Sequence, residues 1–209
     1  MEEPPKATDG KEKPGFDRRI SREEINELSL RKYDGPVRIV SSREGLVSAA
    51  RALKRETVLG FDTETKPAFV KGQSFPVALI QLAGRDAVYI FQLRHLEFPK
   101  ILQNILSNPG IIKAGFAPDY DLKQLKELGE FDPAGFVDLG AVAKREGIKN
   151  HGLRGLAAVL LGFRISKQAQ RSNWSRTTLS PSQISYAATD AWVSREIYLR
   201  LGKNGCKLK

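Results

Sequence analysis

VLGFDTET, residues 58–65, is the stretch that decides the fold, because it is an apolar run that ends in two acids. Its length and apolar content are typical of a buried β-strand. Side chains of a strand alternate between its two faces, so the carboxylates of Asp62 and Glu64 point the same way. Two like charges on a buried face cost free energy unless a cation lies between them. We therefore favour a metal-binding pair over a solvent-exposed pair at a strand end.

The segments on either side of this strand predict a mixed α/β fold. Further strands are expected at 37–40, 76–83, 87–91, 111–116 and 135–139, with a hairpin turn at Gly84-Arg85-Asp86. Helices are expected at 42–55, 98–106, 119–128, 153–161 and 181–201, the last with Ser180 as N-cap and Pro181 in its first turn. A hairpin followed by alternating strands and helices indicates one sheet with a single antiparallel strand, covered by helices.

The two ends of the chain differ in composition from its centre. Residues 1–20 are rich in Pro, Lys, Glu and Gly and are expected to form a disordered tail. Residues 21–36 form an N-terminal extension that starts with a short helix over 21–33, in which Ser21 and Glu24 have the spacing of a capping box. The globular domain is expected to span 37–202, with a C-terminal tail at 203–209.

Composition excludes several classes of protein. The single cysteine, Cys206, excludes a disulfide framework and a cysteine-based zinc site, and it fits a reducing, cytoplasmic setting. No apolar run approaches the roughly 20 residues that span a bilayer. The N-terminus lacks the apolar stretch of a secretory signal. We therefore expect an intracellular protein that has no membrane partner.

Two further acids stand where a metal ligand could lie. Asp121 opens the helix at 119–128 just after a strand, where ligands collect in α/β sheets, although an Asp there can also serve only the helix dipole. Asp119 fits the helix N-cap better, so we favour Asp121 as the functional acid. Asp190 follows Tyr186 by one helical turn, in an apolar stretch whose small alanines allow another element to approach closely.

Three motifs in this order resemble the DEDD exonuclease superfamily, which is DnaQ-like and has the ribonuclease H-type fold. They are FDTET (61–65), DYDLKQL (119–125) and YAATD (186–190), and the block at 172–198 is similar to the ribonuclease D and Werner-helicase exonuclease branch. One class of the superfamily has His five residues before the last Asp, where this sequence has Ser185. The other has Tyr four residues before it, and Tyr186 places this sequence in that class.

This resemblance implies a ribonuclease H-like, mixed five-stranded sheet flanked by helices, and a metal-dependent 3′→5′ exonuclease domain at 37–202. It implies two divalent ions, Mg²⁺ or Mn²⁺, which prefer oxygen ligands. Asp62 would bridge both ions, Glu64 and Asp190 would hold the ion that carries the attacking water, and Asp121 would act on the second ion. Tyr186 would orient the water, and the product would be a 5′-mononucleotide.

The charge pattern favours a nucleic-acid substrate. The net charge is +10, and the segment 147–189 contains basic residues but no acid, which suits a phosphate backbone. Trp174 could stack on a base, with core packing as the equal alternative. The residues expected to contact substrate are Thr63, Lys66, His151, Arg154, Lys167, Arg171, Trp174 and Arg176.

The pattern leaves several alternatives open. The partner is expected to be a single-stranded or 3′-recessed nucleic acid, and nothing in the sequence decides between DNA and RNA. A catalytically inactive nucleic-acid-binding module and a partner-binding module of the same fold are the competing functions. The presence of all four acids and of Tyr186 argues against the inactive nucleic-acid-binding module, while the partner-binding module stays open.

Overall fold

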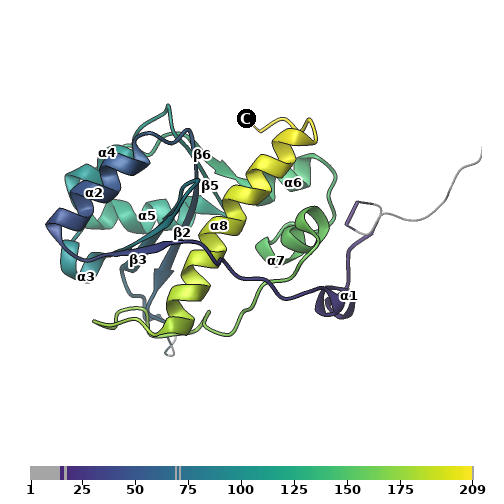
Figure 1. The fold of residues 1–209 in the computed structure, drawn as a ribbon, viewed down its shortest axis with the longest axis horizontal. Helices are drawn as coiled ribbons and strands as arrows, with labels where there is room; N and C mark the ends of the chain where they lie inside the picture. The colour runs from purple at the N-terminus through teal and green to yellow at the C-terminus, as the bar shows by residue number, and fades with distance from the viewer. Residues whose placement is uncertain (1–14, 17, 69, 71, 209) are drawn as a thin grey trace, which may run out of the picture.

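The computed structural model describes residues 15–16, 18–68, 70 and 72–208, so most of the predicted tail at 1–20 lies outside the described residues. The described chain forms one sheet with helices on both faces (Figure 1). Its strands are β1 (Val37–Val40), β2 (Val58–Thr65), β3 (Val77–Ala83), β4 (Val88–Gln92), β5 (Ile112–Gly115) and β6 (Phe136–Asp138). No helix in this part of the chain combines the length and apolarity needed to cross a bilayer.

The sheet has the strand order β1-β4-β3-β2-β5-β6. Strand β3 runs antiparallel to both of its neighbours, and every other pair is parallel, which confirms the mixed sheet with one antiparallel strand. The prediction of a five-stranded sheet is wrong in its strand count, because the strand expected at 37–40 joins the sheet as β1 and makes six. It pairs in parallel with the outer edge of β4, from Val37 opposite Val88 to Val40 opposite Phe91, and so buries Val40 in the core.

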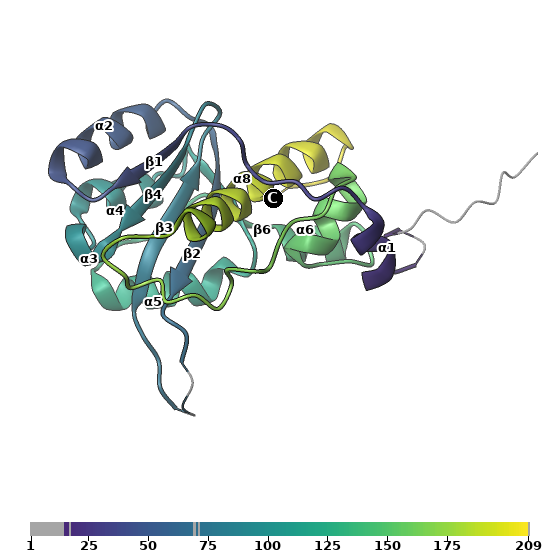
Figure 2. The same cartoon turned by 60° about the horizontal axis from the view of Figure 1, so that its bottom comes forward.

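Helices cover both faces of this sheet. They are α1 (Arg22–Glu27), α2 (Arg43–Leu53), α3 (Leu93–Leu96), α4 (Lys100–Leu106), α5 (Pro118–Leu128), α6 (Leu139–Arg145), α7 (Leu153–Leu156), the π-helix η1 (Ala157–Leu161) and α8 (Pro181–Lys203). Apolar side chains of α2, α3, α4 and α5 form the core on one face, and those of α6, α7, η1 and α8 form the core on the other. Helix α8 lies across that second face (Figure 2).

Several predicted element boundaries need correction. The helix expected over 21–33 ends at Glu27, although its capping box between Ser21 and Glu24 is confirmed. The helix expected at 153–161 changes at Ala157 from α-helix to π-helix and ends with Gly162 in the left-handed conformation. Helix α6 was not predicted from the sequence. The last helix begins with Ser180 and Pro181 as expected, but it continues through Gly202 to Lys203.

Helix α8 lies very close to the sheet at Gly60 in β2. A Cβ atom at Gly60 would lie 1.8 Å from the carbonyl oxygen of Ala191 and 2.9 Å from the amide nitrogen of Arg195. Ala187, Ala188 and Ala191 are fully buried in this contact, which confirms that small residues let α8 approach another element. The contact therefore fixes the distance between the acids of β2 and the acid of α8.

Candidate active site

Four carboxylates from three elements lie near one another at the carboxyl end of β2. Asp62 and Glu64 come from β2, Asp121 from the first turn of α5, and Asp190 from the middle of α8. Asp62, Glu64 and Asp190 each offer a carboxylate oxygen within 4.8 Å of the other two. Among the described residues, no other group of His, Cys, Asp or Glu side chains forms such a cluster.

Strand alternation explains the orientation of the first two acids. Asp62 and Glu64 lie on the face of β2 that α8 covers, because α8 carries Asp190 to that side. The pairing of β2 with β3 shifts register between Glu64 and Thr65. Such irregularities end regular pairing and are common beside active sites. The acids therefore stand where the strand leaves the sheet, with room for a ligand.

Asp121 reaches the cluster through the start of α5. Ala117 precedes this helix with φ +46°, a strained value for a residue with a Cβ, and its amide donates to Asp138 Oδ1 at 3.1 Å. Pro118 then occupies the first helical position, so the prediction that Asp119 is the N-cap is wrong. The Thr63 hydroxyl donates to Asp121 Oδ1 at 2.7 Å. Thr63 thus orients a carboxylate, a contact that the sequence did not reveal.

Burial and mutual repulsion disfavour the ionised forms of these acids. Desolvation and then the charges of Asp190 and Asp121 raise the pKa of Asp62 well above its usual value. Desolvation and the other three acids raise the pKa of Glu64 to about 10. Desolvation raises the pKa of Asp190 to about 7, against the opposing effects of Tyr186 and Lys167. The pKa of Asp121 rises to about 6 by burial, opposed by the Thr63 hydrogen bond.

Tyr186 and Asp190 lie one turn apart on α8, as their spacing predicts. The Tyr186 hydroxyl acts on Asp190 as a hydrogen-bond donor. Burial, followed by the negative charges of Asp190 and Glu64, raises the pKa of Tyr186 above its usual value. In the metal-free protein, Tyr186 is therefore protonated at neutral pH and can donate a hydrogen bond at the site.

The acids fit a hard divalent cation. Every candidate ligand atom is a carboxylate oxygen, the type that Mg²⁺ and Mn²⁺ prefer. Asp190 Oδ1 is buried and has no hydrogen-bond partner in the described structure. Lys167 is the one cation whose charge lowers the pKa of an acid in the cluster. When ionised, the four acids would therefore carry more buried negative charge than nearby protein groups neutralise.

We expect a divalent cation to stabilise the protein more at high pH than at low pH. Without metal, the folded pKa values of Asp121 and Asp190 exceed those of the unfolded chain. Their contribution to stability is therefore full below about pH 4 and lost as pH rises through 6 to 7. A cation reverses this loss, so saturating Mn²⁺ should raise the Tm by roughly 5 °C more near pH 8 than near pH 5. Thermal unfolding at both pH values tests this, and equal Tm increases would contradict it.

The predicted substrate residues fall into two groups. A cavity of ≈ 570 Å³ opens beside Tyr186 and Asp190, and its walls include the predicted residues His151, Arg154 and Lys167. The other predicted residues, Thr63, Lys66, Arg171, Trp174 and Arg176, do not line this cavity. Lys66 lies over the ring of Phe75, with its Nζ 4.5 Å from the ring centroid, and Arg171 and Arg176 are exposed. The cavity walls also include Arg19 and Arg22, which sequence patterns did not single out.

Trp174 corrects one of the predictions. Its side chain is 1% exposed and packs against Tyr186, with the ring centroids 5.8 Å apart. It belongs to the apolar core beneath α8, so it is not available to stack on a base. Of the two alternatives that the sequence allowed, the structure has the core position. Trp174 therefore supports the ring of Tyr186 from the side away from solvent.

The fold and the motifs agree with comparisons to known proteins. The family described as 3′-5′ exonuclease matches residues 37–205. The chain belongs to the 3′-5′ exonuclease family. The bifunctional 3′-5′ exonuclease/ATP-dependent helicase WRN of Mus musculus is 37% identical over 156 residues, which cover 71% of this chain and 11% of that protein. Ribonuclease D of Gluconacetobacter diazotrophicus is 31% identical over 170 residues, which cover 79% of this chain and 42% of that protein.

A solved structure of this family has the same fold. The EXO domain of Aedes aegypti Nibbler superposes with a TM-score of 0.73 at 26% identity, covering 84% of this chain and 91% of that domain. The ribonuclease H-like fold expected from the motifs is thereby confirmed. The chain spans less than half the length of the two curated relatives above. The family match begins at residue 37, so the segment that contains α1 lies outside it.

Proposed function

We propose that this protein removes nucleotides from the 3′ end of a nucleic-acid strand and releases 5′-mononucleotides. The observation that carries the proposal is the cluster of Asp62, Glu64, Asp121 and Asp190 next to a protonated Tyr186. In the reaction, a water oxygen bonds to the phosphorus of the last phosphodiester while the bond from phosphorus to the 3′ oxygen breaks. The proton lost by the water balances the proton gained by the leaving oxygen.

Each residue of the site would have its own role in this hydrolysis. Asp62, Glu64 and Asp190 would hold the ions, and Asp121, held by Thr63, would complete the site from the α5 side. When bound, two divalent ions supply acidity to water and neutralise the leaving oxygen. The Tyr186 hydroxyl, which donates to Asp190 in the free protein, would donate its one proton instead to the attacking water or a phosphate oxygen when substrate is bound. Lys167 stands at the cavity wall near Asp190, where it can meet a phosphate charge.

Digestion of matched DNA and RNA single strands tests this proposal. Each strand carries a 5′ label, and each is incubated with Mg²⁺, with Mn²⁺ and with a chelator. We expect stepwise shortening from the 3′ end, release of 5′-mononucleotides and no reaction with the chelator. Tight strand binding without shortening, under either metal, would instead indicate a catalytically inactive binding module. The ratio of DNA to RNA turnover identifies the preferred sugar.

Tyr186→Phe should reduce kcat about 10- to 100-fold and leave KM almost unchanged, because a hydrogen bond at a charged site is lost while the ring contacts persist. Steady-state kinetics on a single strand measure the effect. Tyr198→Phe on the same helix is the matched control, since Tyr198 packs in the core away from the carboxylates. An unchanged kcat in Tyr186→Phe would remove this hydroxyl from the chemistry.

A further inference from the structure

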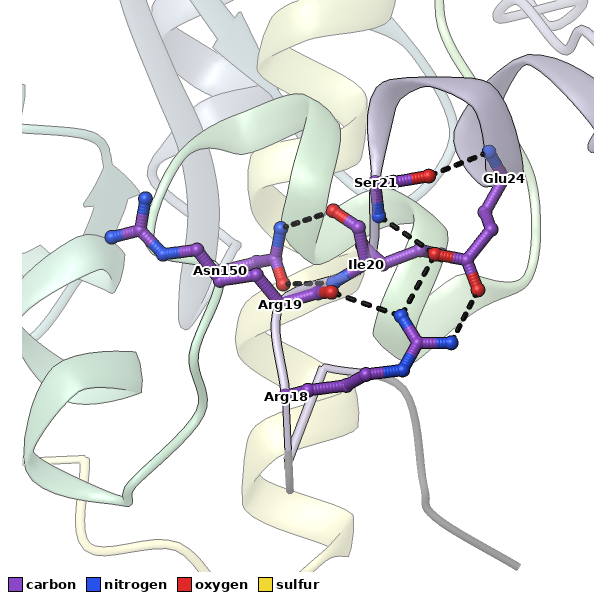
Figure 3. Close-up of polar contacts among 6 residues, drawn as sticks. All are labelled: Arg18, Arg19, Ile20, Ser21, Glu24 and Asn150. Carbon is purple, nitrogen blue, oxygen red and sulfur yellow. Dashed lines mark hydrogen bonds and ion pairs between the residues drawn. The ribbon is translucent and has the colours of Figure 1, made fainter.

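Residues 18–33, which we call the N-terminal arm, precede the region matched by the family. The arm has an internal hydrogen-bond network around the start of α1 (Figure 3). Ser21 and Glu24 form the capping box, and Arg18 pairs with the Glu24 carboxylate at 2.6 Å. These contacts fix the backbone direction between Arg18 and α1. They therefore also fix where the side chains of Arg19 and Arg22 leave the backbone.

The arm is also joined to the exonuclease domain at several points. The Asn150 side chain accepts from the Ile20 amide at 3.0 Å and donates to the Ile20 carbonyl at 3.4 Å (Figure 3). Gly155 leaves room for this side chain, because a Cβ there would lie 2.8 Å from Asn150 Cβ. Arg154 donates to Asn26 Oδ1. The arm therefore has a defined position on the loop that precedes α7.

The later part of the arm is hydrogen-bonded to the segment that follows η1 and to α8. Arg164 donates through Nε to the Leu28 carbonyl and through its amide to the Ser29 carbonyl. The amide of Arg31 donates to the Arg164 carbonyl at 2.9 Å. The Tyr33 amide donates to Thr189 Oγ1, one residue before Asp190. The arm thus runs from the loop before α7 to the catalytic part of α8.

This position brings the arm to the wall of the cavity beside Tyr186 and Asp190. Arg19 and Arg22 line the same cavity as Lys167, Tyr186 and Asp190. The guanidinium of Arg19 points away from the pair of Arg18 and Glu24 (Figure 3). Within the described part of the chain, neither Arg19 nor Arg22 has a side-chain hydrogen bond or an acidic partner, and both are exposed. Asp190, itself a candidate metal ligand, is the one acid among the cavity residues.

We propose that Arg19 and Arg22 bind backbone phosphates of the nucleic-acid strand next to the bond that is cleaved, so that the arm is part of the substrate site. This inference rests on the proposed exonuclease function. Guanidinium groups bind phosphates through paired N–H donors, and a cavity of about this size accommodates one small ligand. The strand continues beyond that ligand, and the arm offers it two cations that pair with no acid among the described residues.

Binding of a labelled single strand tests the arm. The probes are matched oligo(dT) and oligo(U) of about 20 nucleotides, longer than the roughly 4–16 nucleotides that one single-strand site covers. Asp62→Asn is present in every protein so that the strand is not consumed. Arg19→Ala/Arg22→Ala should weaken binding between about 3- and 30-fold. The plot of the logarithm of the association constant against the logarithm of the salt concentration should also become less steep by about 1.4, the value for two lost phosphate contacts.

Arg43→Ala/Arg51→Ala is the matched control. It removes the same charge from exposed positions on α2, away from the cavity. If the two double variants bind with equal affinity and equal salt slope, the arm proposal is wrong. Both variants keep Ser21, Glu24 and Asn150, so the anchors of the arm are intact.

Activity with Asp62 restored separates the arm proposal from the proposed function. For the arm variant, we expect a higher KM on the long strand with unchanged kcat. We also expect an unchanged rate on the 4-nitrophenyl ester of thymidine 5′-monophosphate, which has no neighbouring phosphate. Loss of hydrolysis of that small ester would contradict the proposal, since it would indicate a general defect of the site. A wild-type protein that binds through Arg19 and Arg22 but never cleaves would overturn the proposed function and leave the arm proposal standing.

Discussion

Asp62→Asn is expected to reduce strand cleavage by at least about 10³-fold while the protein remains folded. Asp62 is buried, and the charges of both Asp190 and Asp121 raise its pKa, so it lies near the acids from α8 and α5. Its loss removes charge that positions the divalent ions, and those ions contribute several kcal/mol of transition-state stabilisation. Because each 1.36 kcal/mol changes the rate tenfold, a loss of this size leaves almost no turnover.

The same substitution should leave the metal-free protein at least as stable as the wild type. Desolvation and neighbouring charges oppose ionisation of Asp62, and an amide of the same size removes that charge without opening a cavity. Thermal unfolding in a chelator measures this, and single-turnover cleavage measures the activity. Asp119→Asn is the matched control, because Asp119 is exposed on the same helix as Asp121 and lies outside the cluster. Full activity in Asp62→Asn would rule out the proposed mechanism.

The carboxylate site was predictable because short periodicities determine it. Strand alternation places Asp62 and Glu64 on one face, and the helical turn places Tyr186 beside Asp190. The structure places Asp121 beside Thr63 and near Asp62, but the N-cap assignment of Asp119 that supported the choice of Asp121 is wrong. The backbone turn at Ala117, held by Asp138, starts the helix at Pro118, one residue before Asp119. That turn depends on a contact between segments distant in sequence, which no local pattern reveals.

The substrate surface was less predictable because no periodicity governs its loops. A charge run such as 147–189 indicates a basic region but does not say which cations reach the cavity. Lys167 lines the cavity, whereas Arg171 and Arg176 do not. The side chain of Trp174 is buried in the core. Arg19 and Arg22 were missed for a related reason. Their position depends on the hydrogen bonds between Asn150 and the backbone of Ile20, which connect residues 130 positions apart.

Gly60→Ala should damage both stability and cleavage, although Gly60 is not a ligand. Its added Cβ would lie 1.8 Å from the Ala191 carbonyl oxygen, so β2 and α8 would have to separate by about 1.5 Å to reach ordinary contact. Overpacking of this kind costs about 1–3 kcal/mol, and here the obstacle is backbone, which cannot rotate aside as a side chain does. The free energy of unfolding should therefore fall by about 3 kcal/mol.

The catalytic effect follows from the same displacement. Ala191 is adjacent to Asp190, so a shift of α8 moves Asp190 away from Asp62 and Glu64, which now lie within 4.8 Å of it. A misplacement of about 1 Å can reduce a rate roughly 100-fold, and we expect a loss of that order in kcat at a temperature where the variant is folded. Metal affinity, measured as the rise in Tm with Mn²⁺, should fall in parallel, because the ligands from the strand and the helix no longer converge.

Gly45→Ala is the control for this substitution. Gly45 lies in α2, and a Cβ there would meet its nearest neighbour, Ser42 Oγ, at 3.4 Å, an ordinary contact. We expect Gly45→Ala to leave cleavage unchanged and to stabilise the helix by about 0.5–1 kcal/mol. Wild-type turnover in Gly60→Ala would show that the site tolerates a shift of α8. The geometry of the four carboxylates would then depend on adjustment of their side chains, and the close contact between β2 and α8 would serve packing alone.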